Sequence, residues 1–289
     1  MHWKRINNFK IKSLRQYLAI LVFIHFSFCS TAQNEVKLLS WNLQNFGKNK
    51  KMEQLDFIAE QMQPFDLIAI QEVLKNHGEE AIIRLTKILN KKSKGTYWKA
   101  AVSEPTSGNP YQSERYAFIW NSTRVQLIDS IWLDPYFEEF IEREPCFATF
   151  VFQKDTFTLV NFHAVPKSKQ PEQEIKHFKN YPRLYPSFRL IFLGDFNVPA
   201  HNNVFNPLKK QRFTSALVGQ KTTLKMKCVG KECLASEYDN FYYHPQYFQK
   251  IKAGIIPFYL SFQDMVAARK ISDHVPIWFH FRIKSATSK

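Results

Sequence analysis

Short apolar runs alternate with amphipathic stretches in the first part of the chain. Residues 36–43 and 66–73 are apolar runs of strand length, whereas residues 51–62 and 79–91 carry apolar side chains at helical spacing. Pro64 follows the first of these helices and ends it. Strands that alternate with helices in this way indicate a domain of the α/β class.

Strand-like runs dominate the rest of the chain, with one further helix predicted over residues 171–180. No repeat, low-complexity tract or linker divides the sequence after residue 32. One domain with two sheets packed on each other and helices outside fits this pattern. The predicted strands cover residues 97–102, 115–120, 125–132, 147–153, 156–163, 189–193, 239–243 and 275–283.

The first 32 residues have the three-part pattern of a secretory signal. Five basic residues precede a largely apolar run of 12 residues, 17–28, and small residues follow at 30–32. We expect cleavage after Ala32, a domain over residues 33–289 and a secreted or periplasmic location. A membrane anchor is the alternative, but the apolar run is short for a span. Lipidation of Cys29 is disfavoured because Phe28 is bulky for a lipoprotein signal.

The charge of the chain is strongly basic. The whole sequence has 40 Lys and Arg against 25 Asp and Glu. Cleavage after Ala32 would remove five basic residues and no acidic ones, leaving 35 against 25 and a net charge of +10. A basic surface favours polyanions such as nucleic acid or anionic membranes. Charge alone does not separate these partners from the solubility of an ordinary basic protein.

Cysteine usage suggests one small disulfide loop. Cys228 and Cys233 lie five residues apart in a polar stretch, and we expect them to be bridged in an oxidising compartment. Cys146 begins an apolar strand-like run, which favours a buried free thiol over a metal ligand. The sequence contains no Cys and His spacing typical of zinc sites.

Polar residues that could take part in catalysis or metal binding lie at the ends of the apolar runs. Asp195 and Asn197 follow a predicted strand in the turn Gly194-Asp195-Phe196-Asn197, and Glu72 and Asn42 end two others. A carboxylate at the end of an apolar strand is costly unless it is paired, solvated or bound to metal. Carboxylate and amide oxygens suit a hard cation. A plain Asx turn and a satisfied buried amide are the structural alternatives.

Two histidines occupy similar positions. His163 ends a predicted strand, and His274 follows Asp273 directly before another. A lone histidine is more often structural, but two histidines with candidate carboxylate partners favour acid–base chemistry near neutral pH. Phosphodiester hydrolysis needs both a base to activate water and an acid to protonate the leaving oxygen.

The set of motifs resembles the endonuclease/exonuclease/phosphatase superfamily, with order and spacing that match over the whole chain after residue 32. Within it, the chain most resembles the deoxyribonuclease I-like members. The features leaning to that branch are residues 102–105 before 114–116, and residues 143–145. The resemblance implies a four-layer α/β/β/α sandwich of two packed mixed sheets flanked by helices. The motifs are Trp41-Asn42-Leu43-Gln44, Ile70-Gln71-Glu72-Val73, Ser113-Glu114-Arg115-Tyr116, Arg143-Glu144-Pro145, Phe162-His163, Gly194-Asp195-Phe196-Asn197, Tyr238-Asp239 and Ser272-Asp273-His274-Val275-Pro276.

The resemblance also implies a role for each matching residue. Glu72 would be the main Mg²⁺ ligand, with Mn²⁺ as a substitute, and His163 with Glu114 and His274 with Asp239 would be acid–base pairs. Relatives of this type usually use the histidine of the Ser-Asp-His motif as the base, although sequence does not distinguish the two histidines. The other metal ligands would be Asn42, Asp195 and Asp273, and the substrate contacts Asn197, Arg143 and Tyr111.

The chain departs from the deoxyribonuclease I-like pattern in three places. Leu74 stands where, in these relatives, an arginine that enters the minor groove follows the Gln-Glu-Val motif. Tyr111 lies three residues before Glu114, one residue further than in these relatives. Both changes alter the contacts with DNA that the resemblance would predict. Residues 201–234 contain no matching motif, so Ca²⁺ is left open as a structural or activating ion.

Three functions are compatible with this sequence. The first is an exported endonuclease, expected to be monomeric and without stable membrane insertion, that cuts DNA, with RNA as a further substrate. The second is a phosphatase or a sphingomyelinase-type phospholipase on the same fold, the latter needing an exposed apolar hairpin. The third is a binding or toxin module without catalysis, which the full set of catalytic residue types disfavours. An apolar stretch that could form such a hairpin, or equally be core, contains Phe258, Tyr259, Leu260 and Phe262.

Overall fold

The computed structural model describes residues 34–108 and 113–284. The secretory signal predicted over residues 1–32, and Tyr111, lie outside the described residues. All the helices and strands discussed below belong to one compact unit, Val36–Lys289. The boundary predicted at residue 33 therefore stays a prediction.

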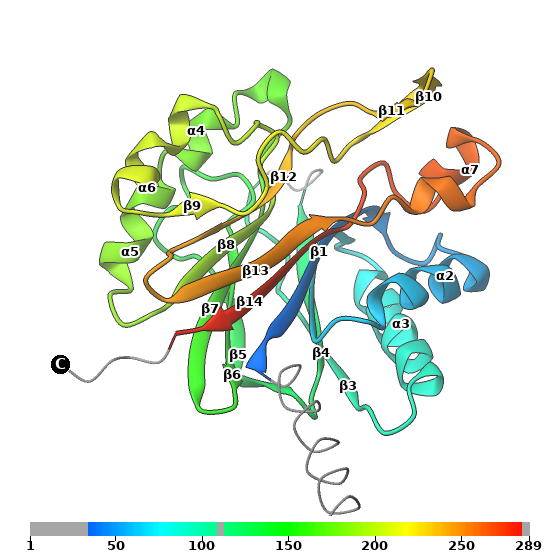
Figure 1. Cartoon of the computed structure of the whole chain (residues 1–289), viewed down its shortest axis with the longest axis horizontal. Coiled ribbons are helices and arrows are strands. Elements are labelled where there is room, and N and C mark those ends of the chain that lie inside the picture. Colours follow the sequence, from blue (N-terminus) through cyan, green and yellow to red (C-terminus); the bar gives the residue numbers. More distant parts are fainter. Residues whose placement is uncertain (1–33, 109–112, 285–289) are drawn as a thin grey trace, which may run out of the picture. The chain divides into compact units, whose positions relative to one another are not determined.

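Two six-stranded sheets form the centre of this unit (Figure 1). Each sheet has one parallel pair, β1·β2 and β7·β8, and is otherwise antiparallel, so both sheets are mixed as predicted. The first sheet has the order β13(Phe248–Ile255), β14(Ile277–Ile283), β1(Val36–Phe46), β2(Leu67–Leu74), β4(Glu114–Asn121), β3(Trp98–Val102), and the second β5(Val125–Leu133), β6(Cys146–Phe152), β7(Asp155–His163), β8(Leu190–Asp195), β12(Asp239–Tyr243), β9(Thr214–Ser215).

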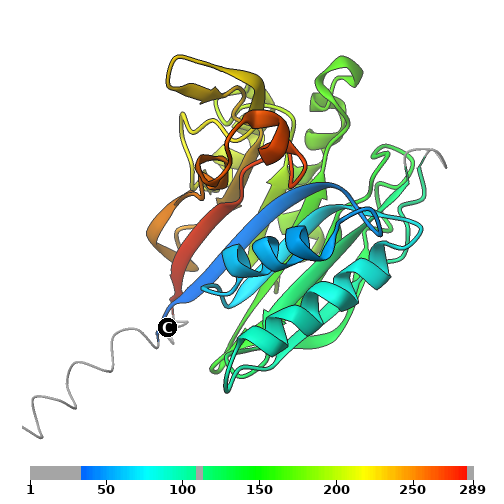
Figure 2. The same cartoon turned by 90° about the vertical axis from the view of Figure 1, so that its right-hand side faces the viewer.

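Helices cover the outer face of each sheet, which confirms the predicted four layers. The helices α2(Met52–Met62) and α3(Gly78–Lys92) lie together over the first sheet (Figure 2). The short helices α4(Glu172–Ile175), α5(Tyr181–Leu184) and α6(Asn206–Lys210) lie on the second sheet's side (Figure 1). A separate hairpin, β10(Leu224–Val229) and β11(Glu232–Leu234), and the helix α7(Met265–Arg269) complete the elements used below.

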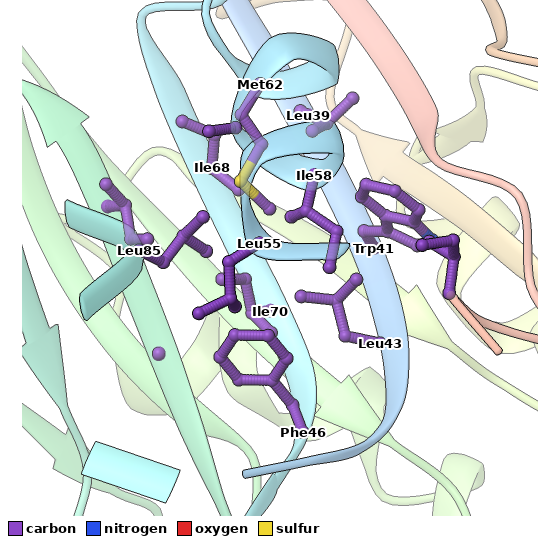
Figure 3. Close-up of a cluster of buried hydrophobic side chains, with 14 of the residues drawn as sticks. Leu39, Trp41, Leu43, Phe46, Leu55, Ile58, Met62, Ile68, Ile70 and Leu85 are labelled. Atoms are coloured by element: carbon purple, nitrogen blue, oxygen red, sulfur yellow. The ribbon is translucent and has the colours of Figure 1, made fainter. Parts of the chain in front are cut away.

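Alternation along the strands creates these layers. In β1, Leu39 and Trp41 lie on the α2 side of the sheet (Figure 3), whereas Leu38 belongs to the core cluster between the two sheets. In β2, Ile68 faces the helices and Leu67 the other sheet in the same way. Successive side chains of a strand point to opposite faces, so a strand buried on both faces reads as a continuous apolar run. This is why the central strands were visible in the sequence.

Other local predictions need correction. The helix predicted over residues 171–180 is wrong, because this segment contains the short α4 and a separate 3₁₀ turn, Phe178–Asn180. The carboxylate of Glu174 in α4 is turned inward, where it accepts the backbone N–H groups of Glu142 and Val165. The strands β9, β10, β11 and β13 were not predicted. In β13 several exposed polar residues hide the apolar pattern of an edge strand.

The cysteines lie as expected from the sequence. Cys228 and Cys233 form a disulfide across the β10–β11 hairpin. Cys146 is a buried free thiol at the start of β6.

Candidate active site

Strand register across the second sheet brings three polar residues into one row. Asp195, the last residue of β8, is in register with His163 at the end of β7 and with Asp239 at the start of β12. The carboxyl ends of the parallel strands β7 and β8 meet at one edge of the sheet, as do those of β1 and β2. Polar residues far apart in the sequence therefore gather at the rim of the sandwich.

Gly194 allows β8 to deliver Asp195 at this point. Its φ is 124°, and a Cβ atom there would lie 2.0 Å from the carbonyl oxygen of Phe162 on β7. Only glycine combines this backbone conformation with so close an approach of the neighbouring strand. The glycine of the Gly-Asp-Phe-Asn turn is thus required by the backbone, whatever the chemistry of its neighbours.

Three of the four predicted metal ligands are in direct contact. The Nδ2 of Asn42 lies 2.9 Å from Oε1 of Glu72 and 3.2 Å from Oδ2 of Asp195. The backbone N–H of Asn45 donates to Oε2 of Glu72 over 2.9 Å. Glu72 has a φ of 58°, in the left-handed region that non-glycine residues rarely adopt, and such conformations cluster at functional sites.

Asp273, the fourth predicted ligand, joins the group through Gln44. The Nε2 of Gln44 donates to Oδ2 of Asp273 over 2.9 Å, and Arg269 donates to the same oxygen over 3.3 Å. The other carboxylate oxygen of Asp273, Oδ1, is buried and has no hydrogen-bond partner. Carboxylates that converge in this way repel one another unless a positive charge compensates them. An unpartnered buried oxygen in an oxygen-rich group fits a hard divalent cation.

His163 is held by Glu114. The Nδ1 of His163 lies 2.9 Å from Oε1 and 3.1 Å from Oε2 of Glu114, and both side chains are buried. The hydroxyl of Tyr116, on the same strand as Glu114, accepts the backbone N–H of His163 over 3.2 Å. These contacts leave Nε2 of His163 directed toward Asp195, 3.5 Å from its Oδ2.

His274 is held by Asp239 in the same manner. Its Nδ1 lies 2.7 Å from Oδ2 of Asp239, and its Nε2 lies 3.5 Å from Oδ2 of Asp195. The backbone around His274 is also fixed to the end of β1: Trp41 donates its indole N–H to the carbonyl of His274 over 2.8 Å, and Ser272 donates to the carbonyl of Asn42 over 2.6 Å. One oxygen of Asp195 thus stands between two histidines, each oriented by its own carboxylate.

The pKa values of both histidines are raised. Burial lowers the pKa of His274, but the negative charges of Asp239 and Asp195 outweigh burial and raise it to about 10. Burial likewise lowers the pKa of His163, while Glu114 acts in the opposite direction and the net shift is upward. Each imidazole is therefore able to hold a proton beside its carboxylate partner.

Asp195, Asp239 and His274 form a compact group whose potential ligand atoms all lie within 4.8 Å of one another. This group shares only Asp195 with the predicted ligand set, since it omits Asn42, Glu72 and Asp273. Because the Nδ1 of His274 is 2.7 Å from Asp239, we attribute the grouping to a His–carboxylate pair rather than to a metal site.

The predicted substrate contacts Asn197 and Arg143 lie beside His163. Asn197, with a φ of 52°, donates its side-chain amide to the carbonyl of Ala164 over 2.9 Å. Arg143 donates to the same carbonyl, and its Nη1 lies 3.4 Å from Oε2 of Glu114. Arg143 is thus an ion-pair partner of Glu114 in this structure, and its contact with phosphate stays a prediction.

Sequence reasoning missed two residues of the site. Lys50 is buried, and its Nζ donates to the carbonyl of Ile271 over 2.6 Å. Burial lowers the pKa of Lys50 to about 8, although Glu72 and Asp273 nearby act to raise it. Thr222 is buried and donates its hydroxyl to Oδ2 of Asp239 over 2.6 Å. A lone Lys and a lone Thr carry no sequence signal for such positions.

Comparison with known proteins gives consistent matches. A model described as "Endonuclease/Exonuclease/phosphatase family" matches residues 39–274. A deoxyribonuclease from Thioalkalivibrio sp. (strain K90mix) is 28% identical over 277 residues, which cover 87% of this chain and 72% of the relative. Human deoxyribonuclease-1 is 28% identical over 174 residues, which cover 56% of this chain and 60% of the relative, less than two thirds of its length.

Solved structures share the fold at lower identity. An endonuclease/exonuclease/phosphatase family protein from Bacteroides thetaiotaomicron has a TM-score of 0.64 at 13% identity, with 86% of this chain and 98% of that chain covered. A mannosyl-6-phosphatase from the same organism has a TM-score of 0.59 at 14% identity, with 86% and 99% covered. At these identities, the likeness shows the fold alone.

Proposed function

The chain belongs to the endonuclease/exonuclease/phosphatase family and is a hydrolytic phosphoesterase of that family; from this premise, we propose that it is a metal-dependent endonuclease that cuts the phosphodiester bonds of DNA. One observation carries the proposal. The Oδ2 of Asp195 lies 3.5 Å from Nε2 of His163 and 3.5 Å from Nε2 of His274. A phosphate beside Asp195 would have one imidazole available for the attacking water and another for the leaving oxygen.

The metal site of this proposal consists of Asn42, Glu72, Asp195 and Asp273. Their oxygen-rich chemistry and the unpartnered Oδ1 of Asp273 fit Mg²⁺, with Mn²⁺ as a substitute. When bound, the cation would supply charge stabilisation for the pentacoordinate phosphorus in the transition state. Ca²⁺ remains an additional structural or activating candidate.

The two buried histidine–carboxylate pairs would carry out the acid–base steps. One histidine, in its neutral form, removes a proton from water as the water oxygen bonds to phosphorus, and the other, in its protonated form, gives a proton to the leaving oxygen as the ester bond breaks. Glu114 and Asp239 fix which ring nitrogen of His163 and His274 faces the substrate, because each binds Nδ1 and leaves Nε2 free for transfer. Asn197 and Arg143, which both donate to the carbonyl of Ala164 next to His163, are the phosphate contacts of this proposal.

A nucleic-acid substrate is supported by charge and by the relatives. Residues 33–289 have 35 Lys and Arg against 25 Asp and Glu, a net charge of +10 that favours a polyanion, and the relatives at 28% identity are named deoxyribonucleases. RNA shares the same phosphodiester chemistry and is a second substrate of the proposal. A phosphatase is the alternative, since a structural neighbour with this fold is a mannosyl-6-phosphatase.

The apolar stretch over residues 258–262 does not support the sphingomyelinase-type alternative. Phe258 is buried, and its ring lies 5.4 Å from that of Trp41. Tyr259 and Phe262 pack against the same core cluster, whereas Leu260 is exposed. The stretch forms a 3₁₀ turn, Phe258–Ser261, rather than an exposed hairpin.

We further propose that the enzyme is an exported monomer over residues 33–289, secreted or periplasmic after cleavage near Ala32. Within residues 34–108 and 113–284, no helix has the length and apolar character needed to cross a membrane. Mass spectrometry of the exported protein tests the cleavage, since a mature chain begins at Gln33 and an uncleaved chain retains residues 1–32.

Incubation of residues 33–289 with supercoiled plasmid and Mg²⁺ tests the endonuclease. We expect nicking that a chelator abolishes and that His163→Ala and His274→Ala each remove. His201→Ala, an exposed histidine on a surface turn, is the matched control and should nick normally. Absence of nicking with every metal and salt tried, together with turnover of sphingomyelin or a phosphomonoester, would overturn the proposal.

A further inference from the structure

The β10–β11 hairpin is a charged surface element directly attached to the candidate active site. Residues 221–234 contain Lys221, Lys225, Lys227 and Lys231 against the single acid Glu232, and we call this segment the basic arm. Figures 1 and 2 both show the arm extending beyond the ends of the two sheets. None of the roles described above uses its side chains, apart from Thr222 at its base.

The base of the arm is fixed to residues of the site. The backbone N–H of Leu224 donates to the carbonyl of Asp273 over 2.7 Å, and Thr223 forms an isolated bridge with His274. Arg269 joins the two sides, since it donates to the carbonyl of Leu224 over 2.6 Å and to Oδ2 of Asp273 over 3.3 Å. The arm therefore starts beside a candidate metal ligand and a candidate acid–base residue.

The outer part of the arm is exposed but covalently restrained. Met226 and Val229 are 68% and 71% exposed, so this part is not held by a core. The disulfide between Cys228 and Cys233 joins the two strands instead and restricts the conformations of the loop between them. A hairpin with this bridge keeps its lysines in a defined region next to the site.

The lysines of the arm divide into two kinds. Lys221 and Lys225 lie 3.2 Å and 3.7 Å from the carboxylate of Glu232. The side chains of Lys227 and Lys231 are exposed and make no ion pair or hydrogen bond with the described residues. Two ammonium groups near the tip are thus available for an anionic partner.

We propose that the basic arm binds backbone phosphates of the nucleic-acid substrate away from the scissile bond, chiefly through Lys227 and Lys231. This inference rests on the proposed function. Five residue steps from Leu224 to Val229 span roughly 16 Å, and duplex DNA carries about one charge per 1.7 Å of its axis. A duplex with one phosphate at Asp195 has several further phosphates within that reach, and DNA is too stiff to bend away over so short a distance.

Nucleic acid fits the arm better than a membrane does. Peripheral membrane elements bury large apolar residues such as Trp, Phe and Leu. The exposed part of the arm offers only Met226 and Val229, with Lys227 between them in the sequence. A lysine-rich hairpin without an aromatic tip is suited to phosphate contacts, which carry no sequence preference.

The test compares two double variants in which two lysines become glutamine. Lys227→Gln with Lys231→Gln changes the arm, and Lys87→Gln with Lys91→Gln on α3 is the control, with the same change in charge at exposed positions. Binding of a fluorescein-labelled duplex of about 20 base pairs is measured by anisotropy over a salt series. A chelator is present to prevent cleavage, which also separates the arm from the metal site.

We expect the arm variant to lower the slope of log K against log salt by about 1.8, or 0.9 for each lost phosphate contact, and to bind at least about tenfold more weakly at 0.1 M salt. The control should keep the wild-type slope. If the arm variant and the control variant have equal slopes of log K against log salt, the proposal for the arm is wrong. Loss of binding to phosphatidylglycerol-containing vesicles with an unchanged DNA slope would also overturn it, and would assign the arm to a membrane.

Plasmid nicking by the wild-type protein, measured in parallel, separates this inference from the function on which it rests. If the wild type nicks plasmid and the arm variant keeps the wild-type slope, the arm proposal alone fails. If the slope changes but the wild type nicks nothing, the endonuclease proposal fails, while the arm stands as a polyanion-binding element.

Discussion

Thr222 donates its hydroxyl to Oδ2 of Asp239 over 2.6 Å, and the same oxygen lies 2.7 Å from Nδ1 of His274. The Thr222 oxygen also accepts the backbone N–H groups of Tyr238 and Asp239 over 3.2 and 3.1 Å. Thr222 therefore orients the carboxylate that orients the histidine. It is a positioning residue, since it acts through Asp239.

Replacement of Thr222 by valine should lower kcat roughly 10- to 100-fold while KM changes little. Valine keeps the shape of the side chain but removes the Thr222 hydrogen bond to Oδ2 of Asp239 and leaves only the contact with His274, so the carboxylate and His274 are less well oriented. Thr222→Ser retains the hydroxyl and should restore most of the activity. Steady-state kinetics on a DNA substrate give both parameters. A loss of activity that Thr222→Ser fails to rescue would point to packing rather than to the hydrogen bond.

Glu72→Gln should separate metal binding from stability. Loss of the carboxylate should lower activity on the order of 100-fold or more, because the charge of the reacting phosphate is then less well stabilised. Mg²⁺ should raise the Tm of the wild type, since a ligand that binds only the folded state stabilises it, and this rise should be absent in the variant.

The matched control is Glu79→Gln at an exposed position in the first turn of α3, which should keep the Mg²⁺ effect. In the presence of a chelator, Glu72→Gln should be at least as stable as the wild type, because one of several clustered negative charges is gone. A variant that is still stabilised by Mg²⁺ as strongly as the wild type would remove Glu72 from the metal site.

Gly194→Ala should destabilise the fold by at least about 3 kcal/mol, because the new Cβ would collide with the carbonyl oxygen of Phe162 2.0 Å away. Gly95→Ala is the control, with a φ of 74° but no atom within 4 Å of the added Cβ, and should cost about 1 kcal/mol from backbone strain alone. Urea unfolding measures both. Equal losses would mean that the approach of β7 and β8 does not require glycine.

The sequence predicted the central layers well because their pattern is local. Ile68 and Ile70 belong to a run that is apolar on both faces of β2, and such a run is visible without any knowledge of its neighbours. Glu72 at the end of that run stands out because an acid there needs a partner. Proximity of His163 and Asp195, by contrast, depends on the register of β7 with β8, which sequence patterns do not give.

Elements with mixed exposure were harder to predict. In β10, Lys225 is partly buried while Met226 is exposed, which reverses the usual relation between polarity and burial. Leu224 is the one buried residue of this strand, and the exposed remainder is restrained by the disulfide rather than by a buried face. Lys50 was missed for a related reason, since a buried lysine is rare and its two carbonyl acceptors lie more than 200 residues away in the sequence.

Alkylation should distinguish the three cysteines of residues 33–289. Burial raises the pKa of the Cys146 thiol, so native protein should take up no iodoacetamide even when the pH is raised to about 9. Denaturation without reductant should expose one thiol, and denaturation with reductant all three, because Cys228 and Cys233 are bridged. Intact-mass measurement counts the adducts. Modification of the native protein would contradict the burial of Cys146, and three adducts without reductant would contradict the disulfide that closes the basic arm.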